Sequence, residues 1–423
     1  MREEITVNLG NLVLSLSDAM DLANPSLTQH QQRTAYTVWQ MGKTDKLEIE
    51  KLEQCFMAAL LHDIGALSLE EKITVRNYEV EDTELHCIKG SCLLEQTPWF
   101  KKIGKIIRYH HKEWQQWGES IDNPIVYSSQ LVFLADFIER QINRDIHILN
   151  QNEDIIIALK ACSGKILHPK LVDLFIATSI REEFWLDLVS PRLYSILLND
   201  GPFRKIEIEL SDISLISQLF RNIIDFRSTY TSTHSSGVAE CAAVLSEIFG
   251  LTESEVELVS VAGNIHDLGK LVIPNSILEK PGPLLKEELN IIKSHAYYTY
   301  YIINSIRGLG NIAEWGAYHH ERLDGSGYPF HCKATDISTN ARILMVADVF
   351  TALSEDRPYR KAMSRKEISR ILNNFSERKL MDANIISLLL DNYDVVYSRV
   401  VEKQAVTREY YMREFCTSTS KGV

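Results

Sequence analysis

The second half of the chain carries a set of histidine and aspartate residues that can hold metal ions. The set comprises His234, His266, Asp267, His295, His319, His320 and Asp348. Imidazoles and carboxylates without a thiolate suit iron, manganese or zinc, and these ligands outnumber what one ion usually takes from a protein. Two divalent ions are therefore predicted. An aspartate beside a histidine at a helix end can bridge such ions, and a water held between them loses its proton near neutral pH, which suits attack on phosphorus.

Each of these residues has a simpler interpretation when it is taken alone. A single histidine in a helix is more often an ordinary packed or polar residue than a ligand, and His–Asp dipeptides are common. Asp348 is the most informative member, because its carboxylate stands within "LMVADVF", among residues that favour burial. An unpaired buried charge costs several kcal/mol, so Asp348 needs a cation or must face solvent.

The same spacing recurs in the first half of the chain. In each half a histidine stands 32 residues before a His–Asp pair, and another stands 24 residues before a His–His pair. The set in the first half is His30, His62, Asp63, His86, His110, His111 and Asp136. Agreement without gaps at several positions indicates an internal duplication. Two copies of one helical module are predicted.

Apolar periodicity predicts the helices that position these residues. "VELVSVAGNIHDLGK" is too densely apolar for an exposed helix, and Gly269 stands where a C-terminal cap would fall. "KEELNIIKSHAYYTYYIINSI" and "ARILMVADVFTALS" predict two further helices. Alternation is convincing only in "KIEIEL", a short strand or extended linker that follows "NDGP". We place the boundary there and expect an all-α chain of two tandem domains, residues 1–200 and 201–423.

Composition limits the partners. The 423 residues are 45% hydrophobic and 24% charged, as in an ordinary globular protein, and the net charge is −12. This balance argues against a nucleic acid polymer or an anionic membrane as partner, whereas a small anionic ligand needs only a local basic pocket. The seven cysteines contain no CxxC pair. With an acidic N-terminus and no apolar stretch long enough to cross a bilayer, the chain is expected in the cytoplasm.

Four longer motifs carry a resemblance to a known family. "HDLGK", "IPNSILEKPGPL", "HHERLDGSGYP" and "ARILMVADVFTALSEDRPYR" resemble the HD-GYP family of the HD superfamily. The members of that family are bacterial metal-dependent phosphodiesterases that open the cyclic dinucleotide c-di-GMP. The resemblance covers about residues 213–400, whereas the first half matches only the broader HD pattern. It implies two tandem HD-type helical domains.

The resemblance also implies roles for single residues. The seven residues of the second half would be the metal ligands, with Asp267 bridging the two ions and Lys270 contacting the scissile phosphate. Iron or manganese is favoured, with zinc, nickel and magnesium as alternatives. The loop that names the family, here Gly327, Tyr328 and Pro329, would contact the substrate, and Arg357 and Arg360 would present cations to phosphate. The expected reaction opens c-di-GMP or 3′,3′-cyclic GMP-AMP (cGAMP) to the linear dinucleotide, and further cleavage to mononucleotides is left open.

The sequence departs from the family pattern at several positions. Tyr230 stands where some members have a glutamate that adds a third metal ion, which is why two ions are predicted. In the first half Ala66 replaces the counterpart of Lys270 and no Gly-Tyr-Pro loop follows, so a regulatory or dimerising domain is favoured over a second active site. A homodimer remains open. The alternative functions are a catalytically weak cyclic dinucleotide receptor and an HD nucleotidase.

Overall fold

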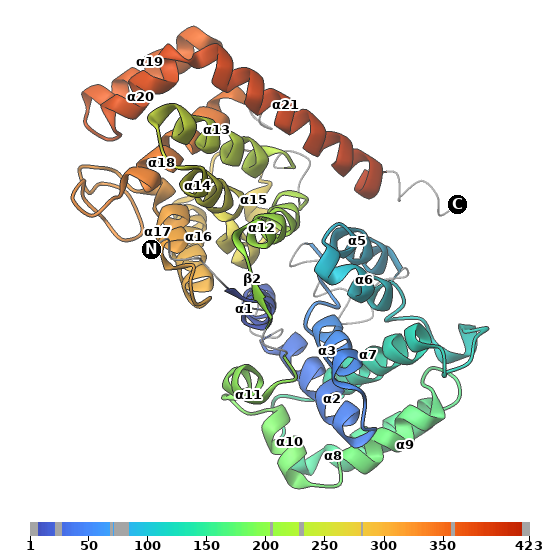
Figure 1. The fold of residues 1–423 in the computed structure, drawn as a ribbon. Helices are drawn as coiled ribbons and strands as arrows, with labels where there is room; N and C mark the ends of the chain where they lie inside the picture. The colour runs from blue at the N-terminus through green and yellow to red at the C-terminus, as the bar shows by residue number, and fades with distance from the viewer. Residues whose placement is uncertain are drawn as a thin grey trace. The chain divides into compact units, whose positions relative to one another are not determined.

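The computed structural model describes residues 7–21, 28–67, 71, 84–203, 206–227, 232–280, 282–356 and 360–416. Within these ranges the structure is helical apart from loops and two short strands, β1 (Val7–Asn8) and β2 (Glu207–Ile208), which pair in one small sheet (Figure 1). The predicted all-α fold is confirmed. Within the alternating segment "KIEIEL", Glu207 and Ile208 form β2, and the last residue, Leu210, begins the next helix.

The chain divides into two compact units. Asn8–Ala66 and Glu70–Ile206 form the amino-terminal unit, and Glu207–Val423, with short segments near residues 7 and 67, forms the carboxy-terminal unit. Each unit has its own apolar core. Phe56, Phe175 and Trp185 are among the largest fully buried side chains of the first unit, and Phe350 is among those of the second.

In the amino-terminal unit, α2 packs against both α3 and α7. This contact brings the first histidine of the set, at the start of α2, close to residues at the end of α3 and within α7. The helices of this unit are α1 (Leu9–Asp21), α2 (His30–Thr44), α3 (Ile49–Leu60), α5 (Glu84–Glu95), α6 (Lys101–Ile107), α7 (Pro124–Gln141), α8 (Asn152–Cys162), α9 (Pro169–Thr178), α10 (Glu182–Leu188) and α11 (Leu193–Asp200).

In the carboxy-terminal unit, α13 is the central helix and packs against α14, α18 and α21. The 3-10 turn η4 (Leu268–Val272) packs against α16, and η5 (Tyr318–His320) packs against α18. The helices are α12 (Leu210–Asp225), α13 (His234–Phe249), α14 (Glu253–Ile265), α15 (Asn275–Leu278), α16 (Lys286–Asn304), α17 (Gly310–Ala317), α18 (Thr339–Ser354), α19 (Arg365–Glu377), α20 (Ala383–Asp391) and α21 (Tyr393–Tyr411).

The end of α14 differs from the sequence-based prediction. The helix begins at a capping box formed by Thr252 and Glu255, but its C-cap is His266, and Gly269 lies within η4. Gly269 is therefore not the cap that the sequence predicted. A Cβ at this position would lie 1.9 Å from the carbonyl oxygen of His295, so glycine is needed for the close approach of η4 to α16.

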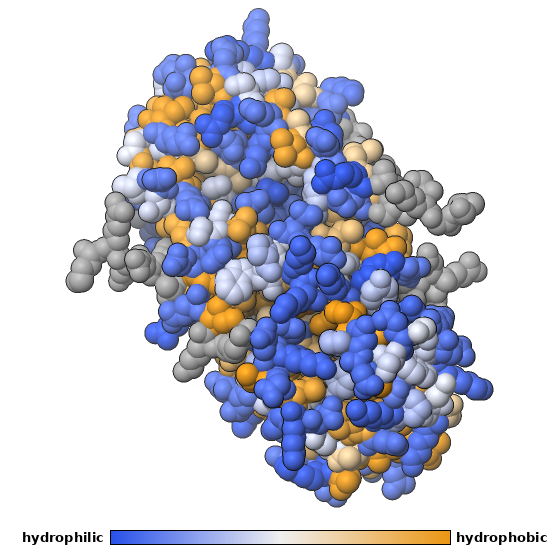
Figure 2. Space-filling model, turned by 45° about the vertical axis from the view of Figure 1, so that its right-hand side comes forward, coloured by the Kyte–Doolittle hydropathy of each residue, from blue (hydrophilic) through white to orange (hydrophobic). Residues whose placement is uncertain are grey.

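Hydrophilic residues prevail on the face of the molecule drawn in Figure 2, with hydrophobic residues between them in small groups. Among the described residues, no helix combines the length and the apolar character that crossing a bilayer requires.

Candidate metal centre

Three side chains from three helices form one side of the candidate centre. His234 is the first residue of α13, His266 caps α14, and Asp348 lies in the middle of α18. Nε2 of His234 is 3.2 Å from Oδ1 of Asp348, and Nε2 of His266 is 4.0 Å from the same oxygen. All three residues are buried, and their ligand atoms lie close enough together for one ion.

The other side is formed by His295 of α16 and by His319 and His320 of η5. Nε2 of His295 lies 3.2 Å from Nε2 of His319, and the three imidazoles also form a group suited to one ion. Asp267 stands between the two sides. Its Oδ2 is 3.1 Å from Nε2 of His266, and its Oδ1 is 3.4 Å from Nε2 of His295. Each carboxylate oxygen thus faces a different set of imidazoles, the arrangement of a bridging ligand.

Hydrogen bonds fix the orientation of these imidazoles. Nδ1 of His266, His295 and His319 lies 2.6–2.8 Å from the carbonyl oxygen of the residue three positions earlier. A carbonyl accepts only from N–H, so each ring carries its proton on Nδ1 and turns a free Nε2 towards the centre. Metal-binding histidines are held in this way.

The buried donor atoms fit metal ions. Nε2 of His266 and Oδ1 of Asp267 are buried without a hydrogen-bond partner, which is costly unless a cation is present. Burial lowers the pKa of His295 to about 4 and that of His320 to about 3, so both imidazoles are neutral at neutral pH, the form that binds metal. For His266 burial also lowers the pKa, but its interactions with the carboxylates of Asp267 and Asp348 together outweigh burial, and the net shift is upward.

Lys270 forms an ion pair with the carboxylate of Asp267. Its Nζ is 2.5 Å from Oδ2 of Asp267. Burial raises the pKa of Asp267, but the neighbouring His266 and Lys270 outweigh that effect and hold it well below its ordinary value. Asp267 is therefore an ionised carboxylate, and the ammonium of Lys270 is at the edge of the predicted metal centre.

The loop after η5 brings a tyrosine beside the histidines. The fully buried Glu321 accepts hydrogen bonds from the backbone N–H groups of Phe330 (2.8 Å) and Cys332 (3.0 Å). At Gly327 a Cβ would lie 2.4 Å from the backbone of Glu321 and its neighbour, so this close turn requires glycine. The ring of Tyr328 lies 4.8 Å from that of His320, and the Tyr328–Pro329 peptide bond is cis.

A pocket of about 410 Å³ opens beside this loop. Its lining includes Tyr328 and Pro329 from the loop and Lys293 and Tyr297 from α16. Nζ of Lys293 lies 5.3 Å from the centre of the Tyr328 ring. The pocket combines aromatic faces with an ammonium group within two residues of His295.

Of the two arginines predicted to contact phosphate, the structure describes Arg360. Arg360 donates hydrogen bonds to the carbonyl oxygens of Ala352 (2.6 Å) and Leu353 (3.2 Å), at the last turn of α18. Its guanidinium complements the C-terminal carbonyls of that helix, and its contact with phosphate stays a prediction. Arg357 and Tyr230 lie outside the described residues.

Sequence reasoning missed Glu355, which directly precedes the motif "DRPYR". Its Oε2 is 3.0 Å from Nδ1 of His234, and its other oxygen accepts from Gln404. The carboxylate of Glu355 therefore orients the imidazole of His234, as backbone carbonyl oxygens orient the imidazoles described above. Its position directly before the motif "DRPYR" was the feature of the sequence that could have identified Glu355.

Replacing Glu355 by alanine should weaken metal binding at the side formed by His234. We expect the affinity of the centre to fall about 10- to 100-fold, because the imidazole loses the partner that fixes its tautomer. Metal retained after dialysis, measured by inductively coupled plasma mass spectrometry, reports the change. Glu377→Ala, at an exposed position of α19, is the matched control. Equal metal retention in both variants would contradict the role of Glu355.

The helical fold and the paired histidine–aspartate sites together define the class of protein. The chain belongs to the HD domain family, whose profile matches residues 15–120 and 218–385. The predicted recognition is confirmed, and both halves match. The chain is 28% identical to 3′3′-cGAMP-specific phosphodiesterase 1 of Vibrio cholerae over 404 residues, which span 93% of this chain and 94% of the relative.

Two further comparisons agree with this assignment. The cyclic di-GMP phosphodiesterase response regulator RpfG of Xanthomonas campestris is 35% identical over 189 residues, 44% of this chain and 49% of the relative. A crystal structure of a cyclic GMP-AMP-specific phosphodiesterase of Vibrio cholerae superimposes with a TM-score of 0.62 at 21% identity, covering 92% of this chain and 98% of that one. The structural match extends the likeness in fold to both halves.

Proposed function

We propose that the chain is a metal-dependent phosphodiesterase that opens a cyclic dinucleotide to the linear dinucleotide, with 3′,3′-cGAMP preferred over c-di-GMP. The observation that carries the proposal is the position of Asp267, whose two carboxylate oxygens face two separate groups of imidazoles. The preference for 3′,3′-cGAMP is supported by the share of this chain that its relatives match. The relatives named as cGAMP-specific include one that matches 93% of this chain, whereas RpfG, named for c-di-GMP, matches 44%.

Two divalent ions would be held by the seven residues predicted from the sequence. His234, His266 and Asp348 would bind one, His295, His319 and His320 the other, and Asp267 both. Ions held in this way lower the pKa of a shared water and supply a nucleophile near neutral pH. Iron or manganese fits this set of imidazoles and carboxylates.

The remaining residues would hold and neutralise the substrate. Lys270, 2.5 Å from Asp267, can turn its ammonium to a phosphate oxygen and stabilise the charge that develops there. Tyr328 and Lys293 border the pocket beside the loop, where a nucleobase can stack on the ring and accept a hydrogen bond from the amine. These positions would fix the phosphodiester over the centre.

Residues 201–423 would thus be the catalytic HD-GYP domain, and residues 1–200 a regulatory or dimerising domain. Ala66 supports this division, because the position that carries Lys270 in the second half has no amine in the first. A homodimer is consistent with such a role.

Hydrolysis of the two cyclic dinucleotides by the purified chain tests the proposal. We expect the Mn²⁺- or Fe²⁺-loaded protein to convert 3′,3′-cGAMP to the linear dinucleotide faster than c-di-GMP, as followed by chromatography of the products. Chelation should stop the reaction and added metal should restore it. Tight binding without turnover under any metal would identify a receptor instead, and faster turnover of c-di-GMP would overturn only the preference.

A further inference from the structure

We propose that the amino-terminal unit holds a second metal centre, which is closed to substrate and therefore serves structure or regulation and not hydrolysis. Its ligands are His30, His62, Asp63, His86, His110, His111 and Asp136. The proposal is independent of the activity of the carboxy-terminal unit.

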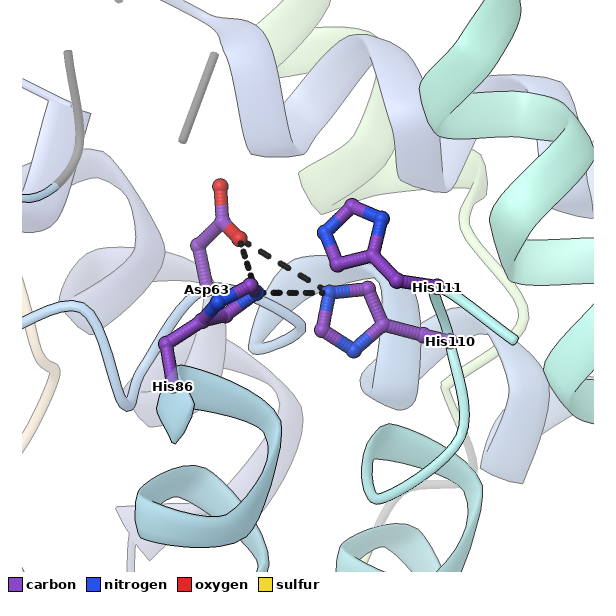
Figure 3. Close-up of side chains that lie close together, drawn as sticks. All are labelled: Asp63, His86, His110 and His111. Carbon is purple, nitrogen blue, oxygen red and sulfur yellow. Dashed lines mark hydrogen bonds and ion pairs between the residues drawn. The ribbon is translucent and has the colours of Figure 1, made fainter. Parts of the chain in front are cut away.

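One side of this centre is drawn in Figure 3, where Asp63 and the three imidazoles point towards one another. Nε2 of His86 is 3.3 Å from Nε2 of His110, and Oδ1 of Asp63 is 3.6 Å from the former and 3.8 Å from the latter. His111 completes the group, with ligand atoms of all four residues close enough for one ion. Three imidazoles and a carboxylate suit zinc, iron or manganese.

The other side has equally short separations. Nε2 of His30 lies 3.2 Å from Nε2 of His62 and 3.4 Å from Oδ2 of Asp63. Oδ1 of Asp136 is 3.4 Å from Nε2 of His30 and 3.6 Å from Nε2 of His62. Asp63 thus divides its two oxygens between two groups of imidazoles, as Asp267 does in the carboxy-terminal unit.

The imidazoles are also oriented as metal ligands are. Nδ1 of His62 and of His110 lies 2.8 and 2.7 Å from the carbonyl oxygen three residues earlier, and Nδ1 of His30 lies 2.5 Å from Glu139. Because Nδ1 of each of these rings faces a hydrogen-bond acceptor, the Nε2 atoms are the ones that converge. Oδ1 of Asp63 is buried without a hydrogen-bond partner. Nitrogen and carboxylate oxygen atoms this close together in a buried site need a proton or a metal cation between them.

Two differences from the carboxy-terminal centre indicate that this one does not hydrolyse a phosphodiester. Ala66 offers no ammonium to a phosphate. In addition, Arg140 donates Nε–H to Oδ1 of Asp136 at 2.9 Å, and its Nη2 lies 3.4 Å from Nε2 of His111. The residue four positions after Asp348 is Ala352, so α18 carries no arginine at the position that corresponds to Arg140.

The guanidinium closes the centre. The side chain of Arg140 is 2% exposed and contacts residues from both sides of the centre. A phosphate would have to displace a buried arginine from its carboxylate to reach the ions. Structural metal sites are closed in this manner, whereas catalytic sites keep a position open.

The metal content of the full-length chain tests the proposal. A variant with Asp267, His266 and His295 replaced by alanine loses ligands on both sides of the carboxy-terminal centre and leaves the amino-terminal unit unaltered. After dialysis, inductively coupled plasma mass spectrometry should find at least one ion for each chain of this variant. A metal-free variant would overturn the proposal.

A second pair of variants locates the remaining ion. In the same background, adding His86→Ala and His110→Ala should remove it, and adding His147→Ala should not, because His147 is exposed and outside the cluster. Retention of the ion by the His86→Ala, His110→Ala protein would place it elsewhere and overturn the assignment. Circular dichroism of both proteins shows whether the helical content is retained.

Discussion

Replacing Asp267 by alanine is expected to lower the rate of cyclic dinucleotide hydrolysis by about a thousandfold or more. Asp267 is the residue whose oxygens face both groups of imidazoles, so its removal weakens both predicted ion sites together. Charge stabilisation by metal ions is worth several kcal/mol in the transition state, and each loss of about 1.4 kcal/mol is tenfold in rate. The initial rate with saturating Mn²⁺ measures the effect.

Two further variants separate the loss of the ligand from general damage. Asp267→Asn keeps the side-chain volume but removes the charge. Its rate of hydrolysis should fall nearly as far as that of the alanine variant. Asp391→Ala, at an exposed position of α20, should keep full activity. Asp267→Ala protein that remained folded and turned over substrate at the normal rate would refute the placement of the active site in the carboxy-terminal unit.

Replacing Gly269 by alanine is expected to destabilise the carboxy-terminal unit and to reduce its metal content. The new Cβ would lie 1.9 Å from the carbonyl oxygen of His295, a distance at which α16 must move. Overpacking of this kind costs about 3 kcal/mol, which corresponds to a fall in melting temperature of roughly 6–12 °C for a unit of this size. Movement of α16 also carries His295 away from Asp267.

Thermal unfolding followed by circular dichroism, together with metal analysis, measures both effects. Gly310→Ala is the control, because a Cβ there would meet nothing nearer than 3.7 Å. An unchanged melting temperature in Gly269→Ala would show that η4 and α16 do not depend on this contact.

The first half has the same close approach at a glycine, since a Cβ at Gly65 would lie 2.0 Å from the carbonyl oxygen of His86. The glycine two residues after each His–Asp pair therefore allows the same close packing in both units.

The clusters of histidine and aspartate and most of the helices around them were accessible from the sequence. Equal separations of histidines in the two halves indicated one module used twice, because such spacing persists only where the intervening helices keep their lengths. Apolar periodicity similarly located the helices α14, α16 and α18. Asp348 stood out because a carboxylate within an apolar helix requires a partner.

The partners of these residues were not accessible in the same way. Glu355 is bonded to His234, 121 residues earlier in the chain, and no local pattern connects them. Arg360 belongs to the motif "DRPYR", from which a contact with phosphate was predicted. In the structure its guanidinium donates a hydrogen bond to a carbonyl oxygen at the end of α18. Gly269 was expected to cap a helix by its conformational freedom, and it serves instead to admit a neighbouring carbonyl.

The sequence by itself thus determined the all-α class, the repeated module and the residues able to bind metal, because these follow from residue type and from spacing along the chain. Only the tertiary structure decided which ring nitrogens face inward, how Asp63 and Asp267 divide their oxygens, and that Arg140 contacts both Asp136 and His111. The reason is physical: hydrogen bonds and ion pairs act over about 3 Å, and packing between distant helices sets those distances.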